Sequence, residues 1–110
     1  MGLFDGILGG IVGAEMAVAV NHLLEKHGGV AGIVGELKRK GLGDTVKSWV
    51  STGPNQPVAA DQLHQALGAD TISQLAAKAG ITAKDLLAKL TQALPVAIDK
   101  LTPGGVVPKA

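Results

Sequence analysis

The stretch TAKDLLAKLTQALPVAIDKL, residues 82–101, decides the fold of this chain. Its large aliphatic side chains recur every three or four residues, which is the spacing of one helix face; they are Leu86, Leu87, Leu90, Leu94, Ile98 and Leu101. Each of them contributes about 1.5–3 kcal/mol when fully buried. We therefore expect a helix over residues 82–101 as the axis of the core. Thr82 is its expected N-cap, and Pro95 should kink it or start a new helix.

Glycine and proline divide the rest of the chain into further helical pieces. The pattern predicts helices over residues 3 to about 27, 30 to about 40, 44 or 45 to 50, 61 to 67, and 70 or 71 to 79, with the GLG stretch at 41–43 as a stop. Residues 51–57 contain GPNQP and form the one clear loop. The expected fold is all-α: a single compact multihelical bundle of about six helices over residues 1–101, followed by a flexible C-terminal tail over 102–110.

Composition excludes several classes of function. The formal net charge is +1, which gives no strong field for attracting nucleic acid. The chain has no cysteine, so it has no disulfide, thiolate nucleophile or zinc–thiolate site. Its 46% hydrophobic content is nearly all aliphatic, because Phe4 and Trp49 are the only aromatic residues.

The beginning of the chain lacks the basic region and cleavage site of a signal peptide. Asp5, Glu15 and Glu25 also divide its apolar part into pieces shorter than the roughly 20 residues that a membrane-spanning helix needs. These observations argue against a signal peptide and against a membrane-spanning helix.

The first thirteen residues contain two stripes at helical spacing. One is apolar and consists of Leu3, Phe4, Ile7, Leu8, Ile11 and Val12; the other is bare and consists of Gly6, Gly9, Gly10 and Gly13. Each glycine costs a helix about 1 kcal/mol, so this helix needs contacts on both faces. Packing in the core of the same chain, self-association and attachment to a membrane surface all remain open. Phe4, Gly9 and Gly13 are candidate interaction residues.

Trp49 and the neighbouring loop residues Asn55 and Gln56 form a second candidate interaction surface. Tryptophan is enriched at binding hot spots, and loops often carry function. The alternative, which the residue type favours, is that a lone tryptophan in a helical domain lies in the core.

The segment LAAKAGIT, residues 75–82, resembles the corner of a helix-turn-helix. The next helix would then present five residues to a DNA groove: Thr82, Ala83, Lys84, Leu87 and Ala88. These residues include one cation and no Arg, Asn or Gln for reading base edges. A tight corner in a small bundle is the favoured interpretation. The cluster of residues 38–40 (KRK), with Lys47 nearby, is either a solvated helix end or a phosphate-binding site.

No combination of residues predicts a reaction, a cofactor or a small-molecule substrate. His22 and His27 are five residues apart, whereas a helix brings metal ligands together at a spacing of four. His64 is the only other histidine. No serine lies in a nucleophile elbow, and the carboxylates are not spaced for acid–base catalysis. We therefore expect no metal site, no catalytic residue and no enzyme.

Several motifs resemble the bacterial YidB family in the right order along the chain. They are MGLFD at 1–5, GLG at 41–43, SWVS at 48–51, NQ at 55–56, QL at 62–63 with ALG at 66–68, LP at 94–95 and IDKLTPG at 98–104. Residues 12–29 depart from the family pattern in being richer in glycine and alanine. The resemblance implies a compact all-helical array in a soluble bacterial cytoplasmic protein. It implies no activity, because the function of the family is unknown.

The favoured function is therefore a non-enzymatic one, in which the chain binds another protein or itself. The N-terminal segment and the surface around Trp49 are the expected contact regions. The alternative is a nucleic-acid-binding accessory that uses the corner at Gly80 and the basic residues 38–40. Association with a membrane surface through the N-terminal helix is a more distant alternative.

Overall fold

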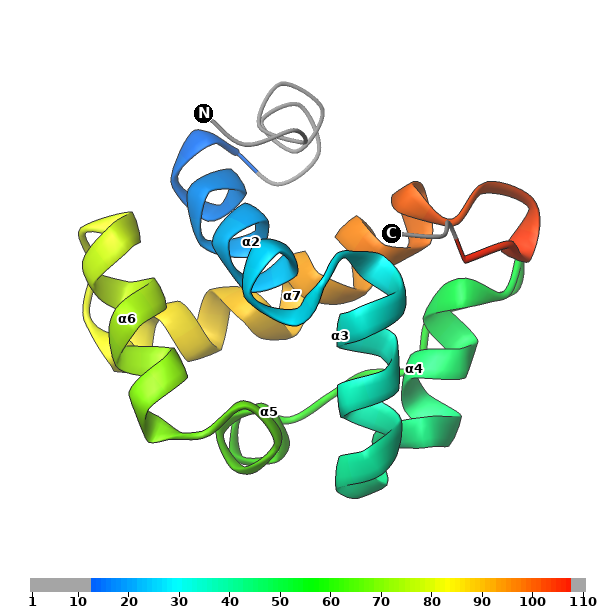
Figure 1. Cartoon of the computed structure of the whole chain (residues 1–110), viewed down its shortest axis with the longest axis horizontal. Coiled ribbons are helices and arrows are strands. Elements are labelled where there is room, and N and C mark those ends of the chain that lie inside the picture. Colours follow the sequence, from blue (N-terminus) through cyan, green and yellow to red (C-terminus); the bar gives the residue numbers. More distant parts are fainter. Residues whose placement is uncertain (1–12, 108–110) are drawn as a thin grey trace.

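Helices are the only regular elements in the part of the chain that the computed structural model describes, residues 13–107. The elements are α2 (Ala14–His27), α3 (Val30–Leu37), the π-helical turn η1 (Lys38–Leu42), α4 (Gly43–Val50), α5 (Ala60–Leu67), α6 (Ala69–Ala79), α7 (Ala83–Leu101) and the 3₁₀ turn η2 (Pro103–Gly105). Figure 1 shows them gathered into one compact body around α7. The predicted all-α class is confirmed.

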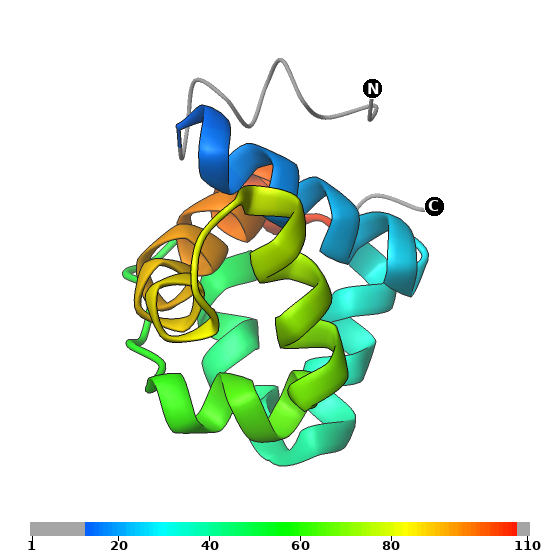
Figure 2. The same ribbon diagram turned by 90° about the vertical axis from the view of Figure 1, so that its left-hand side faces the viewer.

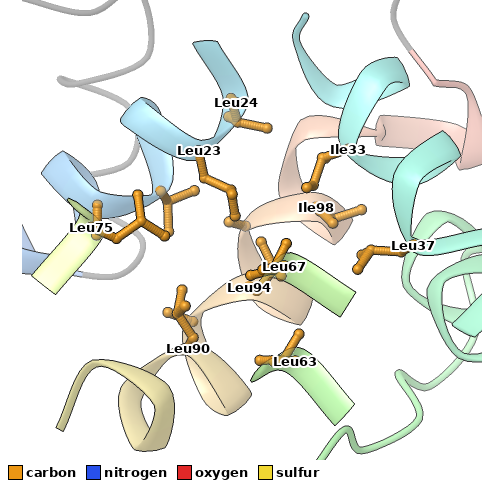
Figure 3. Close-up of a cluster of buried hydrophobic side chains, with 14 of the residues drawn as sticks. Leu23, Leu24, Ile33, Leu37, Leu63, Leu67, Leu75, Leu90, Leu94 and Ile98 are labelled. Atoms are coloured by element: carbon orange, nitrogen blue, oxygen red, sulfur yellow. The ribbon is translucent and has the colours of Figure 1, made fainter. Parts of the chain in front are cut away.

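Helix α7 is the axis of this body, as residues 82–101 predict. It packs against α2, α4, α5 and α6, and Leu86, Leu90 and Leu94 on its inner face are fully buried. Figure 3 shows side chains from α2, α3, α5 and α6 converging on this face. The helix continues through Pro95 to Leu101, so no new helix starts at the proline.

One of the expected helix boundaries is wrong. Gly13 has φ 87° and ψ 156°, so a helix does not run unbroken from residue 3 to residue 27, and α2 begins at Ala14. The GLG stretch does end the second helix, as predicted, because Gly41 leaves the helical conformation (φ 89°, ψ 9°). The chain changes direction sharply there, and α4 begins at Gly43. The described residues contain six α-helices, α2 to α7.

The expected tail begins with a structured segment. Thr102 is buried, and its hydroxyl donates to the carbonyl of Ile98 at 2.7 Å. The turn η2 then closes with a hydrogen bond from the Gly105 amide to the Thr102 carbonyl, and Val107 packs against the core. The segment that directly follows Leu101 therefore contacts the core. Residues 108–110 lie outside the described part of the chain.

The turn between α2 and α3 brings two backbones into direct contact. Gly28 adopts the left-handed conformation, and the Gly29 amide reaches back to the Leu24 carbonyl at 2.7 Å. The first turn of α3 then lies against the end of α2. At Gly32, an added Cβ would lie 1.5 Å from the carbonyl oxygen of His27. Position 32 therefore has no room for a side chain.

We predict that Gly32→Ala destabilises the protein, because the new methyl group forces α2 and α3 apart. Overpacking of this kind costs about 1–3 kcal/mol, and the obstacle here is backbone. Gly35→Ala is the matched control in the same helix, since its Cβ would meet only the Arg39 Nη1 at 3.7 Å. The control should be neutral or gain up to about 1 kcal/mol from helix propensity. Urea unfolding measures both, and equal stability of the two variants would contradict the close contact.

Candidate functional site

The corner between α6 and α7 has the local geometry that its sequence predicts. Helix α6 ends at Gly80 in the left-handed conformation (φ 72°), and the Ile81 amide donates to the Ala76 carbonyl at 3.1 Å. Ala76 is buried, so its small side chain lets the helices cross closely. Thr82 caps α7, because its hydroxyl accepts from the Asp85 amide at 3.1 Å. The turn is therefore fixed from both sides.

The outward side of this corner is small and apolar. Ala83 and Ala88 of α7 are exposed, while Ile81 and Leu87 are half-buried and rest against the core. We call these four residues the corner face. Lys84 is the cation exposed among them. The hydroxyl of Thr82 is used by the cap and has little freedom to contact a ligand.

The basic residues 38–40 lie elsewhere. They belong to η1, and Lys38, Arg39 and Lys40 are all exposed, as is Lys47 on α4. Figures 1 and 2 show η1 at the far end of the α3–α4 pair, well separated from the α6–α7 corner in both views. The nucleic-acid alternative combines the corner at Gly80 with the basic residues 38–40, and the fold does not bring these two features together into one surface.

Trp49 is not a surface residue. It is fully buried, and its indole N–H donates to the carbonyl of Gln56 at 2.8 Å. The backbone N–H of Gln56 in turn donates to the Ser48 hydroxyl, also at 2.8 Å. Asn55 is half-buried and lies near the Pro95 carbonyl, 3.5 Å from its Nδ2. Of this candidate surface only the Gln56 side chain is exposed, so the tryptophan holds the loop and cannot contact a partner directly.

Of the N-terminal candidates, only Gly13 falls within the described residues. It is exposed and opens α2. Phe4 and Gly9 lie outside the described part, and their proposed role rests on their sequence alone. Within residues 13–107, no helix has the length and apolar character to cross a membrane, and no three His, Cys, Asp or Glu side chains are grouped to hold a metal ion.

Sequence reasoning missed one buried polar side chain. Asn21 on α2 is 5% exposed, and its Nδ2 donates to Glu25. Its Oδ1 has no hydrogen-bond partner within the described residues. Position 21 falls among alanines and leucines that face the core, and the helical spacing alone could have placed it there.

The charges around η1 act on one carboxylate. Arg39 hydrogen-bonds Glu36 and lowers the pKa of that carboxyl below its ordinary value of 4.5, with smaller contributions from Lys40 and His27. A carboxyl whose pKa is lower in the folded state stabilises the fold above its unfolded pKa. This contribution is lost as the pH falls through the folded pKa.

We predict that Arg39→Gln raises the pKa of Glu36 toward its ordinary value, because the strongest partner of the carboxylate is removed. Carboxyl carbon NMR titration of the full chain measures this shift directly. The variant should also lose the part of the acid dependence of stability that Glu36 supplies. An unchanged titration of Glu36 would show that Arg39 does not control it.

We predict that Trp49→Phe destabilises the protein by about 1–3 kcal/mol, because the Gln56 carbonyl loses its donor inside the core. Gln56→Ala is the control. It removes only an exposed side chain and keeps both backbone hydrogen bonds, so its effect should stay within about 0.5 kcal/mol. Thermal and urea unfolding check both values. A larger loss for Gln56→Ala than for Trp49→Phe would contradict this arrangement.

Comparison with known proteins identifies the family. The chain is 34% identical over 110 residues to the uncharacterised protein YidB of Escherichia coli strain K12. The aligned region covers 97% of this chain and 83% of that protein. The solved structure of a homeodomain-like protein of unknown function from Shigella flexneri superposes with a TM-score of 0.76 and 32% identity, over 96% of this chain and 85% of the other. The model of the YidB-like protein family matches residues 1–110. The chain belongs to the YidB-like protein family.

Proposed function

We propose that this protein is a non-enzymatic binding protein whose corner face contacts another protein. The observation that carries the proposal is the chemistry of that face. In a helix-turn-helix, the first turns of the second helix present the ligand-reading side chains. Here those positions hold Ala83, Leu87 and Ala88, with Ile81 beside them, and they are exposed or half-exposed.

Small aliphatic side chains on an exposed corner suit an apolar protein segment, because they allow close approach and exclude water. Lys78 and Lys84, the cations that flank the corner in the sequence, are both exposed, and so is the carboxylate Asp85. This balance favours a partner segment that carries an acidic residue beside its apolar side chains. The partner class is therefore an apolar helix or loop with a flanking carboxylate.

The apolar stripe in residues 3–12 supplies a second contact region in this proposal, on the strength of its sequence. Self-association and binding to another protein both fall within the proposal. The cytoplasmic location that the family resemblance implies is part of it as well.

A second candidate function is DNA binding through the same corner. The description of the Shigella flexneri relative as homeodomain-like favours it, since homeodomains read the major groove with the second helix of such a corner. Against it, Lys84 is the one cation between residues 82 and 88, and no Arg, Asn or Gln lies there to read a base. Protein binding remains the better supported of the two.

A photo-crosslinking amino acid placed at position 88 of the full chain tests the proposal in native bacterial cells. We expect one major protein adduct at position 88 and none at position 65, an exposed site on α5 that serves as the control. The introduction of Ala83→Arg should abolish the adduct, because a long cation breaks the apolar contact. An adduct with the same chain would identify self-association.

Two outcomes would count against protein binding at the corner. Equal crosslinking at positions 88 and 65 would show that the corner face is not a specific contact. Adducts at position 88 that consist of nucleic acid would favour the second candidate. Circular dichroism of each variant checks that the helical fold is retained.

A further inference from the structure

The positive charge of this chain is concentrated in one segment. Residues 36–47 carry four cations and two carboxylates, which gives a net charge of +2. The chain as a whole carries +1, so the remaining residues sum to −1. A nearly neutral total charge therefore conceals a local basic surface, which we call the basic turn: Lys38, Arg39, Lys40 and Lys47.

The fold holds the basic turn outward. Leu37 and Leu42, which flank Lys38, Arg39 and Lys40 in the sequence, are buried in the core. Between them, Gly41 reverses the chain at φ 89°, and three consecutive cations are exposed. Helix α4 starts directly after this stretch, at Gly43, and Asp44 in its first turn offsets part of the positive end of the helix dipole. Figures 1 and 2 show the turn as the projecting end of the α3–α4 pair.

We propose that the basic turn binds the phosphate backbone of a nucleic acid without reading its sequence. The side chains are those that phosphate contacts require, and there are enough for a small electrostatic footprint. Arg39 is already held by Glu36, so the three lysines Lys38, Lys40 and Lys47 supply the free contacts. The site is separate from the corner face and does not depend on protein binding there.

An anionic membrane is the other polyanion that a basic turn attracts. Binding in a membrane interface also uses large apolar side chains that enter the lipid. The large hydrophobic residues exposed in the described part of the chain are Val18, Val96 and Val106, and none of them belongs to η1 or α4. Leu42, the large aliphatic residue within the turn, is buried. This arrangement favours phosphate contacts along a nucleic acid strand.

Fluorescence anisotropy with the full chain and a labelled 20-base-pair duplex tests the proposal. Three phosphate contacts predict a slope of roughly −2.7 in log affinity against log salt, which is a loss of roughly 500-fold between 20 and 200 mM salt. Two duplexes of unrelated sequence should bind equally. Lys38→Gln with Lys40→Gln should reduce the affinity about tenfold or more at low salt and bring the slope to roughly −0.9.

The matched control is Lys78→Gln with Lys84→Gln, which removes the same charge beside the corner face. It should leave duplex binding unchanged. The proposal is overturned if wild type fails to bind at 20 mM salt, or if the control variant loses as much affinity as the basic-turn variant. Binding to phosphatidylserine-containing vesicles but not to the duplex would also overturn it and would assign the turn to a membrane surface.

Discussion

The buried aliphatic face of α7 is the constraint on which the rest of this structure depends. Leu86, Leu90, Leu94 and Ile98 are fully buried, and four other helices pack against the same element. Within residues 13–107, Trp49 is the one aromatic side chain in the core, so aliphatic residues, mainly leucine, isoleucine, valine and alanine, fill nearly all of it. Because close-packed aliphatic side chains tolerate little displacement, α7 also fixes the corner at its beginning and the Asn55 loop beside Pro95.

Much of the fold was predictable because its signals are local. The Thr82 cap, the Gly80 turn and the spacing of the α7 leucines each act within a few residues, and sequence spacing is a direct guide to such contacts. Glycine is a poorer guide, because it permits a left-handed turn without requiring one. Gly32 lies inside a helix, where it touches the His27 backbone, whereas Gly41 reverses the chain. The sequence predicted the stop at Gly41 but not the close contact at Gly32, because that contact depends on the packing of α2 against α3, which is not visible in the sequence.

The candidate site was harder to predict than the fold. The loop with two prolines was correctly expected after Val50, yet the position of Trp49 depends on where that loop returns. Its indole N–H meets a carbonyl seven residues further along the chain, and this contact buries the whole ring. No propensity or spacing rule contains that information. The exposed character of Lys84 and Ala88, in contrast, follows from their place away from the face of α7 that carries the leucines.

The two proposed surfaces differ in the physics of binding, and this difference separates their functions. The corner face has small apolar side chains, so its contacts depend on desolvation and respond weakly to salt. The basic turn has exposed cations, so its contacts depend on counterion release and weaken steeply as salt rises. A helix-turn-helix geometry does not by itself decide between protein and nucleic acid as ligand, because function depends on the side chains that a fold presents. In this chain the corner supplies that geometry, while the basic turn lies on a different pair of helices, α3 and α4.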